Sequence, residues 1–143
     1  MIVGFFDRAH RAIVRVVVTG GKQSATLHLE VDTGSQPHIC MDEDWADHLG
    51  IVTTKGHRAT FADGRSKTVL AGAAKVDWFG RSTDVEVIVW PRSKQSAPED
   101  RSQHRYRGTP EGLIGRKLLA SNAVSTDYVN GRVAIIEPAP SGA

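Results

Sequence analysis

Residues 29–35 read Leu29-Glu30-Val31-Asp32-Thr33-Gly34-Ser35, an apolar strand that runs into a tight turn. Before Asp32, leucine and valine alternate with polar residues, which is the period of a half-buried β-strand. A carboxylate at the end of such a strand, on a turn with glycine, is held rigidly where a ligand can reach it. Asp-Thr-Gly alone arises by chance in roughly a few per cent of chains of this length, so its context decides.

The context after the turn is a pair of short helices. Residues 40–51 predict a helix that Asp42 can cap and that Gly50 can end in the left-handed conformation. Much later, Gly112-Leu113-Ile114-Gly115-Arg116 leads into the apolar pair Leu118-Leu119, which predicts a second short helix.

Together, these motifs resemble the retroviral-type (retropepsin-like) aspartic proteases. The resemblance covers about residues 11–136 and rests on Asp-Thr-Gly-Ser, on the helix ending in Leu-Gly, and on the later hydrophobic-hydrophobic-Gly-Arg segment. It implies a mostly β fold, a small closed antiparallel β-barrel with one or two short helices. It also implies an aspartic endopeptidase that needs no cofactor.

Bulk composition indicates one domain covering residues 1–143. The chain is 40% hydrophobic and 24% charged, as in a globular protein with a real core. The formal charge of +2 is too small to imply a nucleic-acid partner.

Cys40 is the sole cysteine, which rules out an intrachain disulfide and fits a reducing compartment, so we expect a cytoplasmic protein. The apolar start, residues 1–6, is too short and too soon interrupted by charge for a membrane span.

Glycine turns divide most of the chain into short strands, the spacing of a small barrel or sandwich. The expected strands are residues 11–19, 25–31, 58–62, 66–74, 75–79, 83–90, 128–129 and 132–136. The pairs Asp63-Gly64 and Asn130-Gly131 are suited to tight hairpin turns. The strands at residues 14–18 and 133–136 are candidates for a dimer sheet.

Residues 91–109 break this pattern. The segment is polar and long for a loop, so we expect a mobile surface insertion, and we expect the tail at residues 137–143 to fray. The basic residues of segment 91–109 offer a competing function, which is binding to a nucleic acid. Glu99 and Asp100 reduce the net positive charge of the segment, however, and such a loop is usually only solvated. The basic and aromatic residues concerned are Arg92, Lys94, Arg101, His104, Arg105, Tyr106 and Arg107.

The resemblance implies that one chain supplies half of an aspartic protease site. Such a site needs two carboxylates around one water, one acting as general base and the other polarising the scissile carbonyl. The sequence holds a single Asp-Thr-Gly, so activity requires a homodimer with Asp32 from each subunit. The partners expected are a second copy and a peptide or protein substrate, with no membrane.

The resemblance also assigns roles to the neighbours of Asp32. Thr33 would hydrogen-bond across the two-fold axis, Gly34 would let the backbone approach substrate, and the Ser35 hydroxyl could donate to Asp32. The hairpin Ala62-Asp63-Gly64-Arg65 occupies the position of the flap that closes over bound peptide. Ile114, Gly115 and Arg116 would support the site.

Two positions depart from the viral pattern, and other readings stay open. Gln36 and Lys117 stand where the viral enzymes often carry acidic or amide residues, which puts the salt bridges around Arg116 in doubt.

A dimeric binding or regulatory module with little protease activity is the alternative function. No metal site is expected, since the histidines lack paired ligand spacing, and Cys40 is expected to be a small buried residue rather than a nucleophile.

Overall fold

The computed structural model describes residues 1–60, 63–90 and 105–138. Ala62 of the expected flap, residues 91–104 of the expected insertion and residues 139–143 of the tail lie outside these ranges. The elements are β1 (Ile2–Phe6), β2 (Ala12–Thr19), β3 (Ser24–Val31), β4 (Ile39–Asp42), α1 (Glu43–Leu49), β5 (Thr53–Thr60), β6 (Ser66–Trp78), β7 (Arg81–Trp90), β8 (Gly112–Ile114), α2 (Arg116–Leu119), β9 (Ala123–Asp127) and β10 (Arg132–Ile136).

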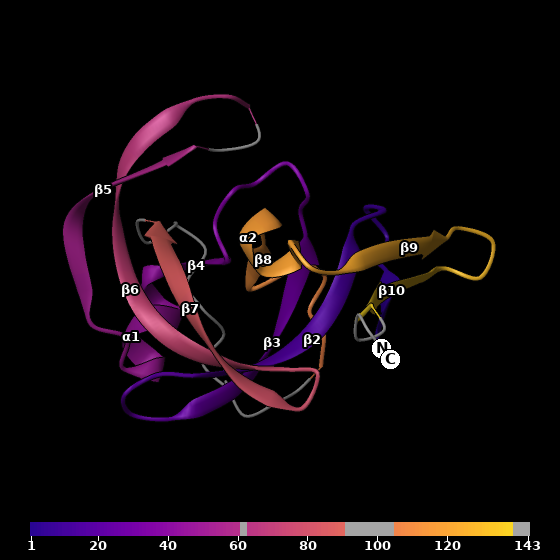
Figure 1. The fold of residues 1–143 in the computed structure, drawn as a ribbon, viewed down its shortest axis with the longest axis horizontal. Coiled ribbons are helices and arrows are strands. Elements are labelled where there is room, and N and C mark those ends of the chain that lie inside the picture. Colours follow the sequence, from indigo (N-terminus) through magenta and orange to yellow (C-terminus); the bar gives the residue numbers. More distant parts are fainter. Residues whose placement is uncertain (61–62, 91–104, 139–143) are drawn as a thin grey trace.

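The expected closed β-barrel is confirmed (Figure 1). The described strands follow the order β5-β6-β7-β4-β8-β3-β2-β1-β10-β9, and an additional pairing of β6 with β2 closes the ring. Two pairings inside the ring, β3 with β8 and β4 with β7, are parallel, whereas the others are antiparallel. Parallel neighbours arise here because long connections bring β7 and β8 back beside earlier strands.

The strand β8 lies between β3 and β4, which follow one another in the chain. It runs parallel to β3, with Val31 opposite Ile114, and antiparallel to β4, with Ile39 opposite Ile114. The loop that carries Asp32 therefore begins on one side of β8 and ends on the other, although β8 comes about 80 residues later in the chain. This arrangement fixes both ends of the loop.

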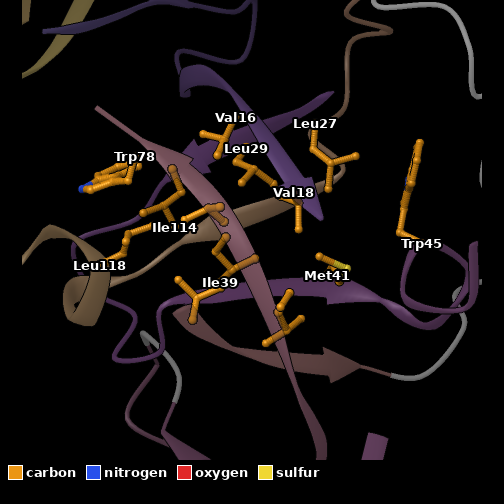
Figure 2. Packing of buried hydrophobic residues seen from close by; sticks show 14 of the residues in the cluster. Val16, Val18, Leu27, Leu29, Ile39, Met41, Trp45, Trp78, Ile114 and Leu118 are labelled. Carbon is orange, nitrogen blue, oxygen red and sulfur yellow. The ribbon is translucent and has the colours of Figure 1, made fainter. Parts of the chain in front are cut away.

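The core fills the interior of the ring (Figure 2). Leu27 and Leu29 of β3 are fully buried, so the alternation read from the sequence gives the inward face correctly. Trp45 and Trp78 are 4% and 6% exposed, which confirms that they pack in the core. Burial of a side chain such as Leu27 or Leu29 contributes roughly 1.5–3 kcal/mol.

The first helix has the caps that the sequence predicts. Asp42 accepts a 2.9 Å hydrogen bond from the amide of Trp45, and Gly50 ends the helix at a φ of 75°. The helix is shorter than expected, however, because Cys40 and Met41 belong to β4. Both are fully buried beside β7 and β8, and these strand pairings outweigh the local helical pattern.

Four other expectations need correction. The expected strands 66–74 and 75–79 form one continuous strand, β6, because β7 pairs along its length. Tyr128 and Val129 lie in a turn, and β9 precedes them. Strand β1 was not expected, and it pairs with both β2 and β10. Strands β2 and β10 are paired on both sides, so the proposed dimer strands have no free edge; the free edges of the described sheet are β5 and β9.

No helix within the described ranges is long and apolar enough to cross a membrane.

Candidate active site

Asp32 lies immediately after β3, at the point where β3 and β8 end together. Its amide donates a 2.9 Å hydrogen bond to the carbonyl oxygen of Ile114, which continues the β3–β8 pairing by one residue. The Asp32 side chain is half-buried. The strand thus delivers the carboxylate to the rim of the barrel, as the sequence predicts.

The turn after Asp32 is built around its carboxylate. The amide of Gly34 donates to Oδ1 at 3.0 Å, and the hydroxyl of Ser35 donates to Oδ2 at 3.0 Å. Ser35 is only 2% exposed, whereas Thr33 and Gly34 are exposed. Both carboxylate oxygens are therefore oriented by the loop, while the tip of the loop remains accessible.

The start of α2 fastens this loop to the barrel. The amide of Gly115 donates to the carbonyl oxygen of His38 at 3.0 Å, and that of Arg116 donates to Ser35 at 2.7 Å. A Cβ at Gly115 would lie 2.1 Å from the carbonyl oxygen of Pro37, so only glycine fits there.

The side chain of Arg116 is exposed, so its support for the loop comes from its backbone amide. Lys117 likewise donates its amide to the carbonyl oxygen of Gln36 at 3.1 Å. The Lys117 side chain reaches to 4.0 Å from Glu86. Gln36 and Lys117, the two residues that depart from the viral pattern, are thus joined by a backbone hydrogen bond.

The expected flap is the hairpin between β5 and β6. Asp63 Oδ1 accepts a 2.9 Å hydrogen bond from the amide of Arg65, and Gly64 has a φ of 81°, as a tight turn requires. Figure 1 shows this hairpin curving from the barrel toward the same edge of the view as the loop after β3. Asp63, Gly64 and Arg65 are exposed, and Arg65 Nε lies 3.9 Å from Asp63 Oδ2 within the turn.

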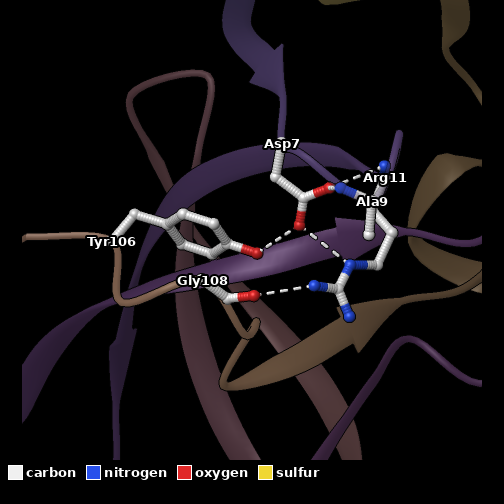
Figure 3. Close-up of polar contacts among 5 residues, drawn as sticks. All are labelled: Asp7, Ala9, Arg11, Tyr106 and Gly108. Atoms are coloured by element: carbon white, nitrogen blue, oxygen red, sulfur yellow. Dashed lines mark hydrogen bonds and ion pairs between the residues drawn. The ribbon is translucent and has the colours of Figure 1, made fainter.

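A polar network beside the start of β2 was not expected from the sequence (Figure 3). Asp7 accepts hydrogen bonds from Arg11 Nε at 2.8 Å and from the Tyr106 hydroxyl at 2.5 Å. Arg11 also donates to the carbonyl oxygen of Gly108 at 2.7 Å. Burial of Asp7 would raise its pKa, but the hydrogen bonds from Tyr106 and Arg11 prevail and lower it to about 2.

A buried histidine lies next to this network. His28 is 3% exposed, with Glu111 Oε1 at 3.6 Å from its Nδ1 and the ring of Tyr106 at 5.3 Å. Its amide donates to Glu111 Oε2 at 2.9 Å. Burial raises the pKa of Glu111, and His28 opposes that shift. The alternation of His28, Glu30 and Asp32 along β3 is the sequence signal that could have identified this second face.

Cys40 is fully buried, and burial together with the nearby Asp32 raises the pKa of its thiol to about 12. A thiol in this state is a poor nucleophile. The described residues also contain no group of three or more His, Cys, Asp or Glu placed to hold a metal ion.

Comparison with known families identifies one family. The family model for aspartyl proteases matches residues 14–118, which span the strand before Asp32, the flap hairpin and α2. This chain belongs to the aspartyl protease family. The barrel and the motifs are those of its retropepsin-like members. A search of curated proteins finds no match to the chain.

Proposed function

We propose that two copies of this chain form a homodimeric aspartic endopeptidase, in which each copy contributes one Asp32. The observation that carries the proposal is the Asp32 turn itself. Its two carboxylate oxygens are oriented by Gly34 and Ser35, and the exposed tip at Thr33 leaves room for a second loop. Because this chain carries a single Asp-Thr-Gly loop, a symmetric pair of chains would complete the site.

The chemistry follows from bringing two carboxylates together. Two such groups a few Å apart share one proton, since ionising both is costly. The ionised carboxylate takes a proton from the water, which attacks the scissile carbonyl, and the protonated one hydrogen-bonds to the carbonyl oxygen. Collapse of the tetrahedral intermediate then passes a proton to the leaving amine.

Two other features of the chain fit the proposal, a hairpin that could cover an extended peptide substrate and a free strand edge that could bind a second copy. The hairpin of β5 and β6 would close over the peptide and exclude water from the carboxylates. Strand β9 is a free edge of the described sheet, and all five of its residues are exposed. Such an edge can add a strand from a second copy, which is a common way for β-proteins to associate.

Cleavage of a fluorogenic peptide library by the wild-type protein and by Asp32→Asn tests the proposal. We expect cleavage that needs Asp32, that a statine-type inhibitor blocks, and that rises faster than linearly with protein concentration. Asp84→Asn is the matched control, because it removes one exposed carboxylate that pairs with Lys75, far from β3 in the sheet order.

The alternative function, a dimeric binding or regulatory module, makes the opposite prediction. A protein that is dimeric in solution but cleaves nothing in an Asp32-dependent way would support it. In that result the Asp32→Asn protein would keep its cellular effect.

A further inference from the structure

The strand that delivers Asp32 has a second, polar face. Leu27 and Leu29 point into the core, and Val31 packs against it, so His28, Glu30 and Asp32 share the opposite face. Residues two apart on a strand lie about 6.6 Å from each other, so Glu30 is the neighbour of Asp32 along this face. The mutual influence of the two carboxylates agrees with that placement, because Asp32 adds to the upward shift of the Glu30 pKa that burial causes.

One end of this polar face is closed. His28 is buried beneath the ring of Tyr106 and against Glu111. Tyr106 is fixed in turn by its hydrogen bond to Asp7 and by a ring contact with Phe5 at 5.3 Å. Glu30 is half-buried, so it is the open position between this closed end and Asp32.

The carboxylate of Glu30 is only partly offset by positive charge. No hydrogen bond or ion pair to it is found in the described part of the chain. Arg11 is the cation that acts on Glu30, but its guanidinium already binds Asp7 and the carbonyl oxygen of Gly108. Leu113, the β8 residue opposite Glu30, and Ile13, its β2 partner, bring no charge.

The local charge is therefore negative. Arg11 acts on both Asp7 and Glu30, so a single guanidinium faces three carboxylates, those of Asp7, Glu30 and Asp32. A partly buried carboxylate attracts a cation more strongly than an exposed one, because water screens it less. A peptide side chain that ends in a cation gains this attraction when it lies over Glu30.

We propose that Glu30 is a specificity-determining residue that selects substrates with lysine or arginine beside the scissile bond. The inference rests on the proposed function, since it assigns a substrate class to the same site. A lysine side chain has the length to reach from a backbone held at Asp32 to a carboxylate about 6.6 Å along the strand. Tyr106 and Glu111 limit the subsite, because they cover His28 beyond it.

The test begins with a mixture-based peptide library whose cleavage sites are read by mass spectrometry. Matched peptides then carry lysine, norleucine or glutamate at the preferred position. We expect wild-type kcat/KM to favour lysine over norleucine by about tenfold. In Glu30→Gln this preference falls to about one, and in Glu30→Lys it turns toward glutamate.

The control is Asp84→Asn, which removes the same charge from an exposed site and should keep the lysine preference. Circular dichroism checks that each variant folds, and Glu30→Gln, nearly identical in shape, carries the test if Glu30→Lys does not fold. Asp32-dependent cleavage without a basic preference, or with one that Glu30→Gln retains, overturns the inference and leaves the proposed function intact. Absence of any Asp32-dependent cleavage removes both.

Discussion

The backbone amide of Arg116 donates a 2.7 Å hydrogen bond to the carbonyl oxygen of Ser35, so the start of α2 holds the turn that orients Asp32. Ser35 in turn donates its hydroxyl to Asp32. The position of the carboxylate thus depends on a segment about 80 residues away in sequence, consistent with a site supported from a rigid element.

Gly115→Ala should loosen this connection. The new Cβ would lie 2.1 Å from the carbonyl oxygen of Pro37 and 2.8 Å from that of Ser35, so the loop or α2 must move. We expect a loss of about 2–4 kcal/mol in the free energy of unfolding, measured in urea, together with a large loss of activity. Gly131→Ala is the control, because a Cβ there meets nothing within 4 Å and only its φ of 67° is unfavourable. It should cost about 1 kcal/mol, and an equal cost at the two positions would contradict the account.

Ser35→Ala should impair catalysis more than folding. It removes the hydroxyl that donates to Asp32 Oδ2 while keeping the buried Cβ. We expect kcat/KM to fall about tenfold, since a hydrogen bond to a charged group is lost. The measurement compares kinetics with Ser121→Ala, where the serine is exposed. Wild-type kinetics in Ser35→Ala would show that the hydroxyl does not orient the carboxylate.

Asp7→Asn should destabilise the protein in a pH-dependent way. The folded-state pKa of Asp7 is lowered from 3.8 to about 2, so its contribution is complete above the unfolded value and is lost as pH falls toward 2. We expect a difference of about 1–3 kcal/mol between wild type and Asp7→Asn at neutral pH. Urea unfolding from pH 2 to 7 should show this gap narrowing below about pH 4.

Tyr106→Phe is a partner test of the same network, because it removes one donor to Asp7 and keeps the ring over His28. It should show part of the Asp7→Asn effect. A gap that stays constant with pH in Asp7→Asn would mean that the carboxylate charge does not stabilise the fold.

Cys40 should be inert in the folded protein. It is fully buried and its thiol pKa is about 12, so little thiolate forms at neutral pH and reagents cannot reach it. We expect slow reaction with a thiol-specific dye under native conditions and one reactive thiol per chain in guanidinium chloride. Rapid native labelling that abolishes activity would contradict the assignment of hydrolysis to Asp32.

Much of the barrel could be predicted from local patterns. The alternation in β3, the Asp42 and Gly50 caps of α1, and the Asn130-Gly131 turn are all encoded by neighbouring residues. The strand β4 could not be predicted in this way, because Cys40 and Met41 are strand residues only through pairing with β7 and β8. Long-range pairing overrides local preference at such positions.

The candidate site shows the same division. Asp32, Gly34 and Ser35 meet within one turn, so their arrangement follows from the motif. The need for glycine at position 115, and the contacts of Tyr106 with Asp7, depend on segments far apart in sequence. Glu30 lies between these extremes, since its place beside Asp32 follows from the strand period but the binding of Arg11 to Asp7 and Gly108 does not.

Subunit mixing is the most direct test of a shared active site. Wild-type protein is equilibrated with increasing amounts of Asp32→Asn, and peptide cleavage is measured per wild-type chain. If one Asp32 from each copy is required, random exchange with a ninefold excess of the variant should reduce that activity to about one tenth. Activity per wild-type chain that stays unchanged, in a mixture shown to form mixed dimers, would mean that a single Asp32 suffices and would contradict the account.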